Sequence, residues 1–226
     1  MRQLALGVGL HDRAVFDSFQ PGENRQAVAA LRALACARGE TALYIHGAAA
    51  TGKSHLLQAA CALQSGAAYL PLREVAKLGP GLLEGSAALP LLAIDDLQVI
   101  AGDAGWEQAL FALYNERLGR GLRFVIAATA PARALGLELP DLESRLTALT
   151  HYGLRPLDES QQREALRLRA HARGLELPEE TLLFLQRHFA RDMARLCGLL
   201  DQLDAASLAE QRRLTVPFIR EVLGQP

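Results

Sequence analysis

Lysine is almost absent from this sequence of 226 residues: Lys53 and Lys77 are its only lysines, whereas 22 residues are arginines. Basic and acidic side chains nearly cancel, 24 against 25, which leaves a formal net charge of −1. Proteins that hold nucleic acid over a broad face carry a clear excess of positive charge there. The composition therefore argues against a chain that grips DNA directly over a wide surface.

Cysteine and histidine are also few, and they form no pattern typical of a metal centre. The three cysteines (Cys36, Cys61 and Cys197) are far apart without a CxxC pair, and the six histidines show no HExxH or HxxxH spacing. Such cysteines are expected to be buried, reduced thiols. No apolar run approaches the ~20 residues that span a bilayer, and the N-terminal apolar stretch is too short for a secretory signal. We therefore expect a cytoplasmic protein without membrane association.

Short apolar runs alternate with segments of helical periodicity in the first two thirds of the chain. The runs typical of buried strands are 42–46, 67–71, 91–95, 123–128 and 151–154, and the helical segments between them are 23–37, 53–63 and 106–120. This alternation predicts an α/β fold with a mainly parallel sheet. After Pro156 the pattern is helical only, with helices expected at 160–173, 178–190, 192–210 and 216–223. We therefore predict an α/β core followed by a small helical domain, divided near 155–157.

A phosphate-binding loop of pattern GxxxxGK[ST] occupies positions 47–54, directly after the first predicted strand. Gly47 and Gly52 let backbone N–H groups turn inward around a phosphate, with Thr51 beside them in the loop. Lys53 adds a compact positive charge for the outer phosphates, and the Ser54 hydroxyl ligates Mg²⁺. The helix that follows directs its positive N-terminus at the same anion.

Polar side chains follow the next two buried strands. Asp95 and Asp96 end the third strand, where buried carboxylates need partners. Asp95 is placed to hold Mg²⁺ through water, and Asp96 to orient an attacking water. Thr129 ends the fourth strand, within reach of a γ-phosphate or that water. The structural alternatives are aspartates that cap a turn and an ordinary strand-end hydroxyl.

A short helix predicted at 140–146 carries one arginine, Arg145. A planar, permanently charged guanidinium stabilises phosphoryl transfer when it is offered to a neighbour's nucleotide. Taken alone, Arg145 would instead be assigned to a surface salt bridge.

Together these features resemble the AAA+ ATPases of the DnaA family, and within it the Hda branch of regulatory inactivators. The resemblance covers essentially the whole chain, and the stretches that carry it beyond the phosphate loop are 16–24, 55–57, 94–96, 101–103, 106–115, 139–146, 200–204 and 214–218. It implies a P-loop AAA+ core with a five-stranded sheet at 16–156, an all-helical lid domain at 157–226, and an N-terminal clamp-binding peptide and linker at 1–15.

The resemblance also assigns a nucleotide site. It implies that Lys53, Ser54 and Asp95 hold ADP or ATP with Mg²⁺, and that Asn24 and His55 contribute to the same site.

In the helical domain, Ala194 takes the position of the family's sensor-2 arginine. Arg195, our candidate for the nucleotide contact, lies one residue later and is turned by ~100° around the helix. Arg191 is the other candidate. Such a displacement weakens the preference for ATP over ADP.

The function implied by the resemblance is negative regulation of replication initiation. Such a protein, in its ADP-bound form on the DNA-loaded sliding clamp, makes the ATP-bound initiator DnaA hydrolyse its ATP. Arg145 would then act in trans as an arginine finger, the protein's own ATPase activity would be weak at most, and DNA would be reached only through the clamp. Gln3, Leu4 and Leu6 resemble the clamp-binding pattern QLxLPL, with Gly7 in place of its proline. A homodimer is compatible with this interpretation.

Two parts of DnaA are missing from the pattern. The chain shows no helix-turn-helix domain after the helical domain, and the connection 72–90 is too short for an initiator-specific helical insertion. An autonomous ATPase of the helicase-loader kind remains an alternative, favoured by Asp95 and Asp96. A small-metabolite phosphotransferase ranks last, because such kinases insert an arginine-rich lid into the core.

Overall fold

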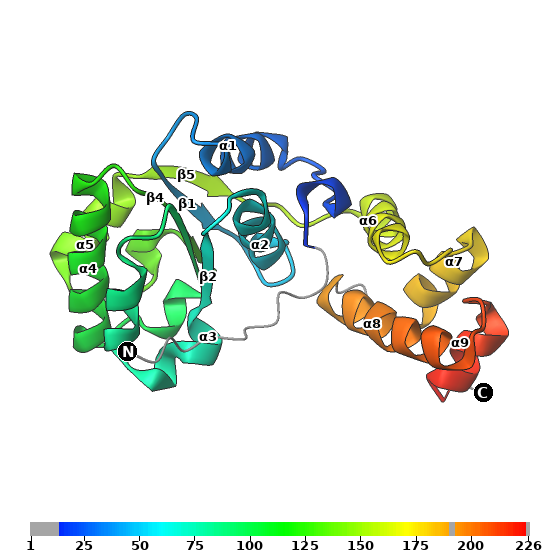
Figure 1. Ribbon diagram of the computed structural model, residues 1–226. Coiled ribbons are helices and arrows are strands. Elements are labelled where there is room, and N and C mark those ends of the chain that lie inside the picture. The colour runs from blue at the N-terminus through cyan, green and yellow to red at the C-terminus, as the bar shows by residue number, and fades with distance from the viewer. Residues whose placement is uncertain (1–13, 190–192, 225–226) are drawn as a thin grey trace.

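The computed structural model describes residues 14–189 and 193–224 and shows an α/β core followed by a helical domain (Figure 1). Within these ranges five strands form one sheet in the order β2-β3-β4-β1-β5, and every neighbouring pair is parallel. The strands are β1 Ala42–His46, β2 Ala68–Pro71, β3 Leu91–Asp95, β4 Arg123–Ala128 and β5 Thr150–Gly153. The predicted fold class is confirmed.

Helices cover both faces of the sheet, because successive strand side chains point to opposite faces and both are apolar. Leu43 and Ile45 of β1 belong to the apolar layer shared with α1 (Arg25–Ala35) and α2 (Lys53–Leu63). Tyr44 belongs to the opposite layer, with α4 (Ala104–Gly119) and α5 (Pro140–Thr147). In Figure 1, α1 and α2 accordingly lie on one side of the strands and α4 and α5 on the other.

The connections of the core are built from short helices. The segment between β2 and β3 contains α3 (Leu72–Val75) and two 3₁₀ helices at Ala76–Leu78 and Pro80–Ser86. Other 3₁₀ helices are Phe16–Ser18, Leu97–Val99 and Ala132–Ala134. The connection between β2 and β3 packs on the layer of α4, so it is part of the core rather than an independent insertion.

The helical domain consists of α6 (Glu159–Ala172), α7 (Glu179–His188), α8 (Met193–Glu210) and α9 (Val216–Val222). A capping box begins α6: the Asp158 side chain accepts from the Gln161 amide at 2.8 Å, and the Gln161 side chain accepts from the Asp158 amide at 3.1 Å. The four helices share an apolar core of their own. In the described ranges, no helix has the length and apolar character needed to span a membrane.

Candidate functional site

The phosphate loop lies between the carboxyl end of β1 and the start of α2. Parallel strands bring their carboxyl ends to one edge of the sheet, which is where ligands bind in open α/β folds. A Cβ atom on Gly47 would lie 2.7 Å from the Leu154 carbonyl oxygen. Gly52 has φ +92°, and a Cβ atom there would lie 2.5 Å from a ring carbon of Phe19. The packing of the loop therefore requires glycine at both predicted positions.

Lys53 is buried and closes the loop on itself. Its ammonium donates to the carbonyl oxygens of Gly47 at 2.7 Å and Ala48 at 2.8 Å. The Thr51 hydroxyl donates to the same Ala48 carbonyl at 2.9 Å. Burial lowers the pKa of Lys53, and the negative charges of Asp95 and Asp96 oppose that shift. The loop thus places one positive charge at the edge of the sheet, as a phosphate site requires.

Asp95 is 1% exposed at the end of β3, and both its carboxylate oxygens have partners. One accepts from the Asp96 amide at 2.8 Å, and the other from the Tyr69 hydroxyl at 2.8 Å. The side chains of Ser54 and Gln58 lie near the same hydroxyl, and burial raises the pKa of Tyr69. Tyr69 thus holds one predicted Mg²⁺ ligand, Asp95, and lies near the other, Ser54. It escaped prediction because only the sheet order places β2 beside β3.

The donor set fits Mg²⁺ bound together with a nucleotide. Among the described residues, no cluster of three or more His, Cys, Asp or Glu side chains could hold a metal by itself. Mg²⁺ commonly takes one or two protein ligands and completes its shell with water and phosphate oxygens. Ser54 and Asp95 would supply that protein share, and the ion would neutralise phosphate charge.

Asp96 adopts a left-handed conformation, φ 59°, and its carboxylate is held by two side chains that we did not predict. Arg73 donates to it at 2.9 Å and Gln98 at 2.7 Å. Burial acts to raise the pKa of Asp96, but the hydrogen bonds from Arg73 and Gln98 and nearby positive charge lower it overall. Gln98 also accepts from the Thr129 amide at 3.1 Å. Gln98 therefore joins Asp96 to Thr129, whose predicted contact with the reaction stays a prediction.

Asn24 joins the core to the segment that leads into the helical domain, and His55 joins the core to α6 of that domain. The Asn24 side chain accepts from the Arg155 amide at 2.8 Å and donates to the Arg155 carbonyl at 2.9 Å. His55 lies 2.9 Å from the Val15 carbonyl oxygen through one ring nitrogen and 3.0 Å from the Arg169 guanidinium through the other. These contacts assign both residues a structural role, and their contact with nucleotide stays a prediction.

We expect His55 to make folding stability depend on pH. Burial, and then the charge of Arg169, lowers the pKa of His55 from 6.5 to about 4, although the Val15 carbonyl opposes the shift. The unfolded state therefore binds more protons than the folded state between these values, so stability falls as the pH drops from about 6.5 to about 4. The loss amounts to about 3 kcal/mol at most. Urea unfolding at several pH values measures it.

The His55→Gln variant should lose this part of the pH dependence. His171→Gln is a matched control, because His171 is exposed on α6 and its replacement should leave the dependence unchanged. Equal pH dependence in the wild type and the His55→Gln variant would contradict the prediction.

The remaining predicted residues lie on two other elements or outside the described ranges. Arg145 is exposed on α5, and no described residue forms an ion pair with its guanidinium. Arg195 is exposed in the first turns of α8. Arg191 and the predicted clamp-binding residues lie outside the described residues, the latter being Gln3, Leu4 and Leu6.

The fold and the loop geometry define an α/β protein with a phosphate-binding loop, and solved structures share this fold. Domain III of the DnaA protein of Thermotoga maritima matches with a TM-score of 0.78 and 24% identity, covering 93% of this chain and 95% of that one. AMPPCP-bound DnaA from Aquifex aeolicus matches with a TM-score of 0.68 and 21% identity, covering 85% of this chain and 65% of that one. The RuvB Holliday junction branch migration motor of Thermotoga maritima matches with a TM-score of 0.67 and 15% identity, covering 95% of this chain and 72% of that one.

The helical domain gives the more specific match. The family model described as "Hda, lid domain" matches residues 158–223. The chain thus has a DnaA-type fold, and its residues 158–223 match the lid domain of the Hda family.

Proposed function

We propose that this protein is a nucleotide-dependent regulator of DnaA: in its ADP-bound form, held by the DNA-loaded sliding clamp, it makes ATP-bound DnaA hydrolyse its ATP. The single observation that carries the proposal is Arg145, an exposed arginine without an ion-pair partner among the described residues, on a helix anchored to a DnaA-type core. An arginine supplied from outside a nucleotide site stabilises the charge of phosphoryl transfer there.

Nucleotide binding by this chain is supported by the geometry of its phosphate loop. Lys53 and Ser54 begin α2, the charge of the buried Asp95 acts on Lys53, and the Tyr69 hydroxyl donates to Asp95. The DnaA of Aquifex aeolicus, which shares this fold, was solved with AMPPCP bound. We assign ADP as the resident nucleotide because Ala194 takes the place of the family's sensor-2 arginine.

Clamp binding rests on the resemblance of Gln3, Leu4 and Leu6 to the clamp-binding pattern. A net charge of −1 supports a protein that reaches DNA through the clamp rather than by itself.

The second candidate is an autonomous ATPase of the helicase-loader kind, favoured by the two carboxylates at the end of β3. The environment of Asp96 argues against an autonomous ATPase, because Arg73 and Gln98 both donate to the carboxylate that would have to orient the attacking water.

The test is reconstitution with purified components. ATP-bound DnaA is incubated with this protein, with and without clamp loaded on DNA, and release of ADP from DnaA is followed. We expect fast hydrolysis only when both the protein and the loaded clamp are present. Rapid ATP turnover by this protein alone would support the autonomous ATPase instead, and no stimulation of DnaA would overturn the proposal.

The nucleotide that copurifies separates the two candidates further. ADP retained through purification and identified after extraction is expected for the regulator.

A further inference from the structure

Glu107, in the first turn of α4, is a carboxylate buried without a positively charged partner. Its side chain is 0% exposed, and no described arginine, lysine or histidine forms an ion pair with it. Buried carboxylates are costly unless hydrogen bonds satisfy them. Its partners are therefore all backbone amides, and they come from two loops that are far apart in the sequence.

The first loop follows the predicted Mg²⁺-site strand. One Glu107 oxygen accepts from the amide of Gly102 at 2.7 Å. Gly102 lies in the turn between Leu97–Val99 and α4, a few residues after Asp96. The 3₁₀ helix just before this turn contains Gln98, which donates to Asp96 and accepts from the Thr129 amide. Glu107 is thus attached to the loop that follows Asp95 and Asp96 at the end of β3.

The second loop leads into α5. Glu107 accepts from the Glu138 amide at 3.0 Å and from the Leu139 amide at 2.7 Å. Leu139 is the N-cap of α5, and it provides no side-chain capping bond. The Glu107 carboxylate therefore satisfies the amide of the N-cap residue and that of the residue before it, and its negative charge lies near the positive end of the α5 dipole.

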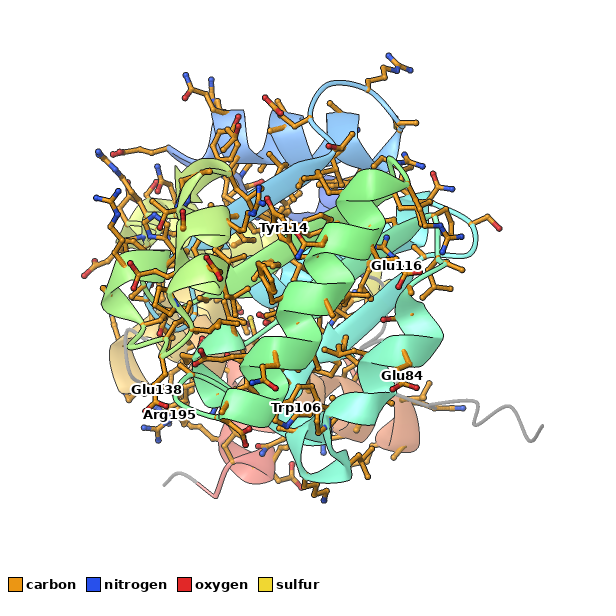
Figure 2. All side chains as sticks on the ribbon, turned by 90° about the vertical axis from the view of Figure 1, so that its left-hand side faces the viewer. Glu84, Trp106, Tyr114, Glu116, Glu138 and Arg195 are labelled. Carbon is orange, nitrogen blue, oxygen red and sulfur yellow. The ribbon has the colours of Figure 1, made fainter. Side chains whose placement is uncertain are left out.

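The rest of α5 is held on the same helix. Leu142 and Leu146 are buried, so Arg145 between them points away from the core. Tyr114, two turns after Glu107 on α4, approaches the Arg145 carbonyl at 3.5 Å. Figure 2 shows α4 with Trp106 and Glu138 near one end and Tyr114 farther along. The helix α4 thus holds both ends of the element that presents Arg145.

We infer that Glu107 is a positioning residue that couples the protein's own nucleotide site to Arg145. The inference rests on the proposed function, in which Arg145 acts on the nucleotide of DnaA. A change in the loop after Asp96 would move the Gly102 amide, and the shared carboxylate would transmit that shift to the start of α5. Displacement of a catalytic group by about 1 Å can cost about 100-fold in rate.

Glu107→Gln is the variant of choice, because the amide keeps the size but directs an N–H donor at backbone N–H groups. We expect maximal stimulation of DnaA hydrolysis, at saturating concentration of this protein, to fall by about 10- to 100-fold. The affinity for ADP and the concentration for half-maximal stimulation should stay unchanged. A merely structural defect would lower the active concentration instead, which saturation overcomes. Glu116→Gln, on the same helix but exposed, is the matched control.

A double variant tests whether Glu107 acts through Arg145. Stimulation by Glu107→Gln/Arg145→Ala should equal that by Arg145→Ala alone, because the group being positioned is already gone. Full stimulation by Glu107→Gln at saturation would overturn the inference. Full stimulation by Arg145→Ala would instead overturn the proposed function, so the two failures are distinguishable.

Hydrogen exchange on the unmodified protein gives a test that does not depend on how the variants fold. Removal of the bound ADP should change the exchange rates of the amides of Gly102, Glu138 and Leu139 together. A response confined to the loop after Asp96 would overturn the coupling.

Discussion

Replacing Arg145 by alanine should lower the stimulation of DnaA hydrolysis by about 1,000-fold or more, the range associated with arginine fingers. The guanidinium lies exposed on α5 and no described residue pairs with it, so its loss should cost this chain little stability. Binding of ADP should be unchanged, because the residues around the phosphate loop lie on other elements. Single-turnover hydrolysis by ATP-bound DnaA in the presence of loaded clamp measures the effect.

Two further variants separate the charge of Arg145 from its geometry. Arg145→Lys keeps the positive charge but loses the planar pair of donors, so we expect it to recover only part of the stimulation. Arg133→Ala removes another exposed arginine, on a 3₁₀ helix of the same connection, and should stimulate like the wild type. Normal stimulation by Arg145→Ala would contradict an arginine finger at this position.

Replacing Arg117 by alanine should destabilise the core by about 3 kcal/mol or more. Arg117 is 1% exposed on α4 and has no carboxylate partner among the described residues. Its guanidinium donates to the carbonyl oxygens of Ser86 at 2.8 Å, Leu89 at 2.9 Å and Arg123 at 2.5 Å. The alanine variant leaves these acceptors without donors and opens a cavity. For a protein of this size the melting temperature should fall by about 6–12 °C.

Neighbouring variants make this prediction specific. Burial is the main reason that the pKa of Arg117 falls to about 10. The buried guanidinium is therefore stabilised by the carbonyl oxygens to which it donates and not by water. Arg117→Lys has a single ammonium in place of the planar guanidinium, so its stability should lie between those of the wild type and Arg117→Ala. Arg120→Ala, one turn later and paired with Glu116 on the surface, should change stability by less than about 0.5 kcal/mol. An Arg117→Ala variant as stable as Arg120→Ala would contradict the assignment.

The local pattern of this chain predicted its elements closely. The strands β1, β3 and β4 and the helix α2 have the predicted bounds, and the other strands differ by a residue at their ends. These strands are apolar along their length because both sheet faces are covered, which gives a strong signal in the sequence. The phosphate loop was equally clear, since its chemistry requires particular residues at fixed spacing.

The partners of the site residues could not be predicted in the same way. Tyr69, Arg73 and Gln98 hold the two aspartates, yet each is an unremarkable polar residue in its own segment. Arg117 and Glu107 were expected to lie in a helix, but their burial among backbone carbonyls and amides was not predicted. Such contacts depend on which strands are neighbours and on how α4 crosses the sheet.

The sequence alone therefore determined the α/β class, the position of the phosphate loop and the division into core and helical domain, because periodicity and loop chemistry act over a few residues. Only the tertiary structure decided that Tyr69 meets Asp95, that Asn24 meets Arg155 and His55 meets α6, and that Glu107 bonds both loops at the start of α4. These contacts join residues far apart along the chain, and such residues meet only after the sheet order and the helix packing are set.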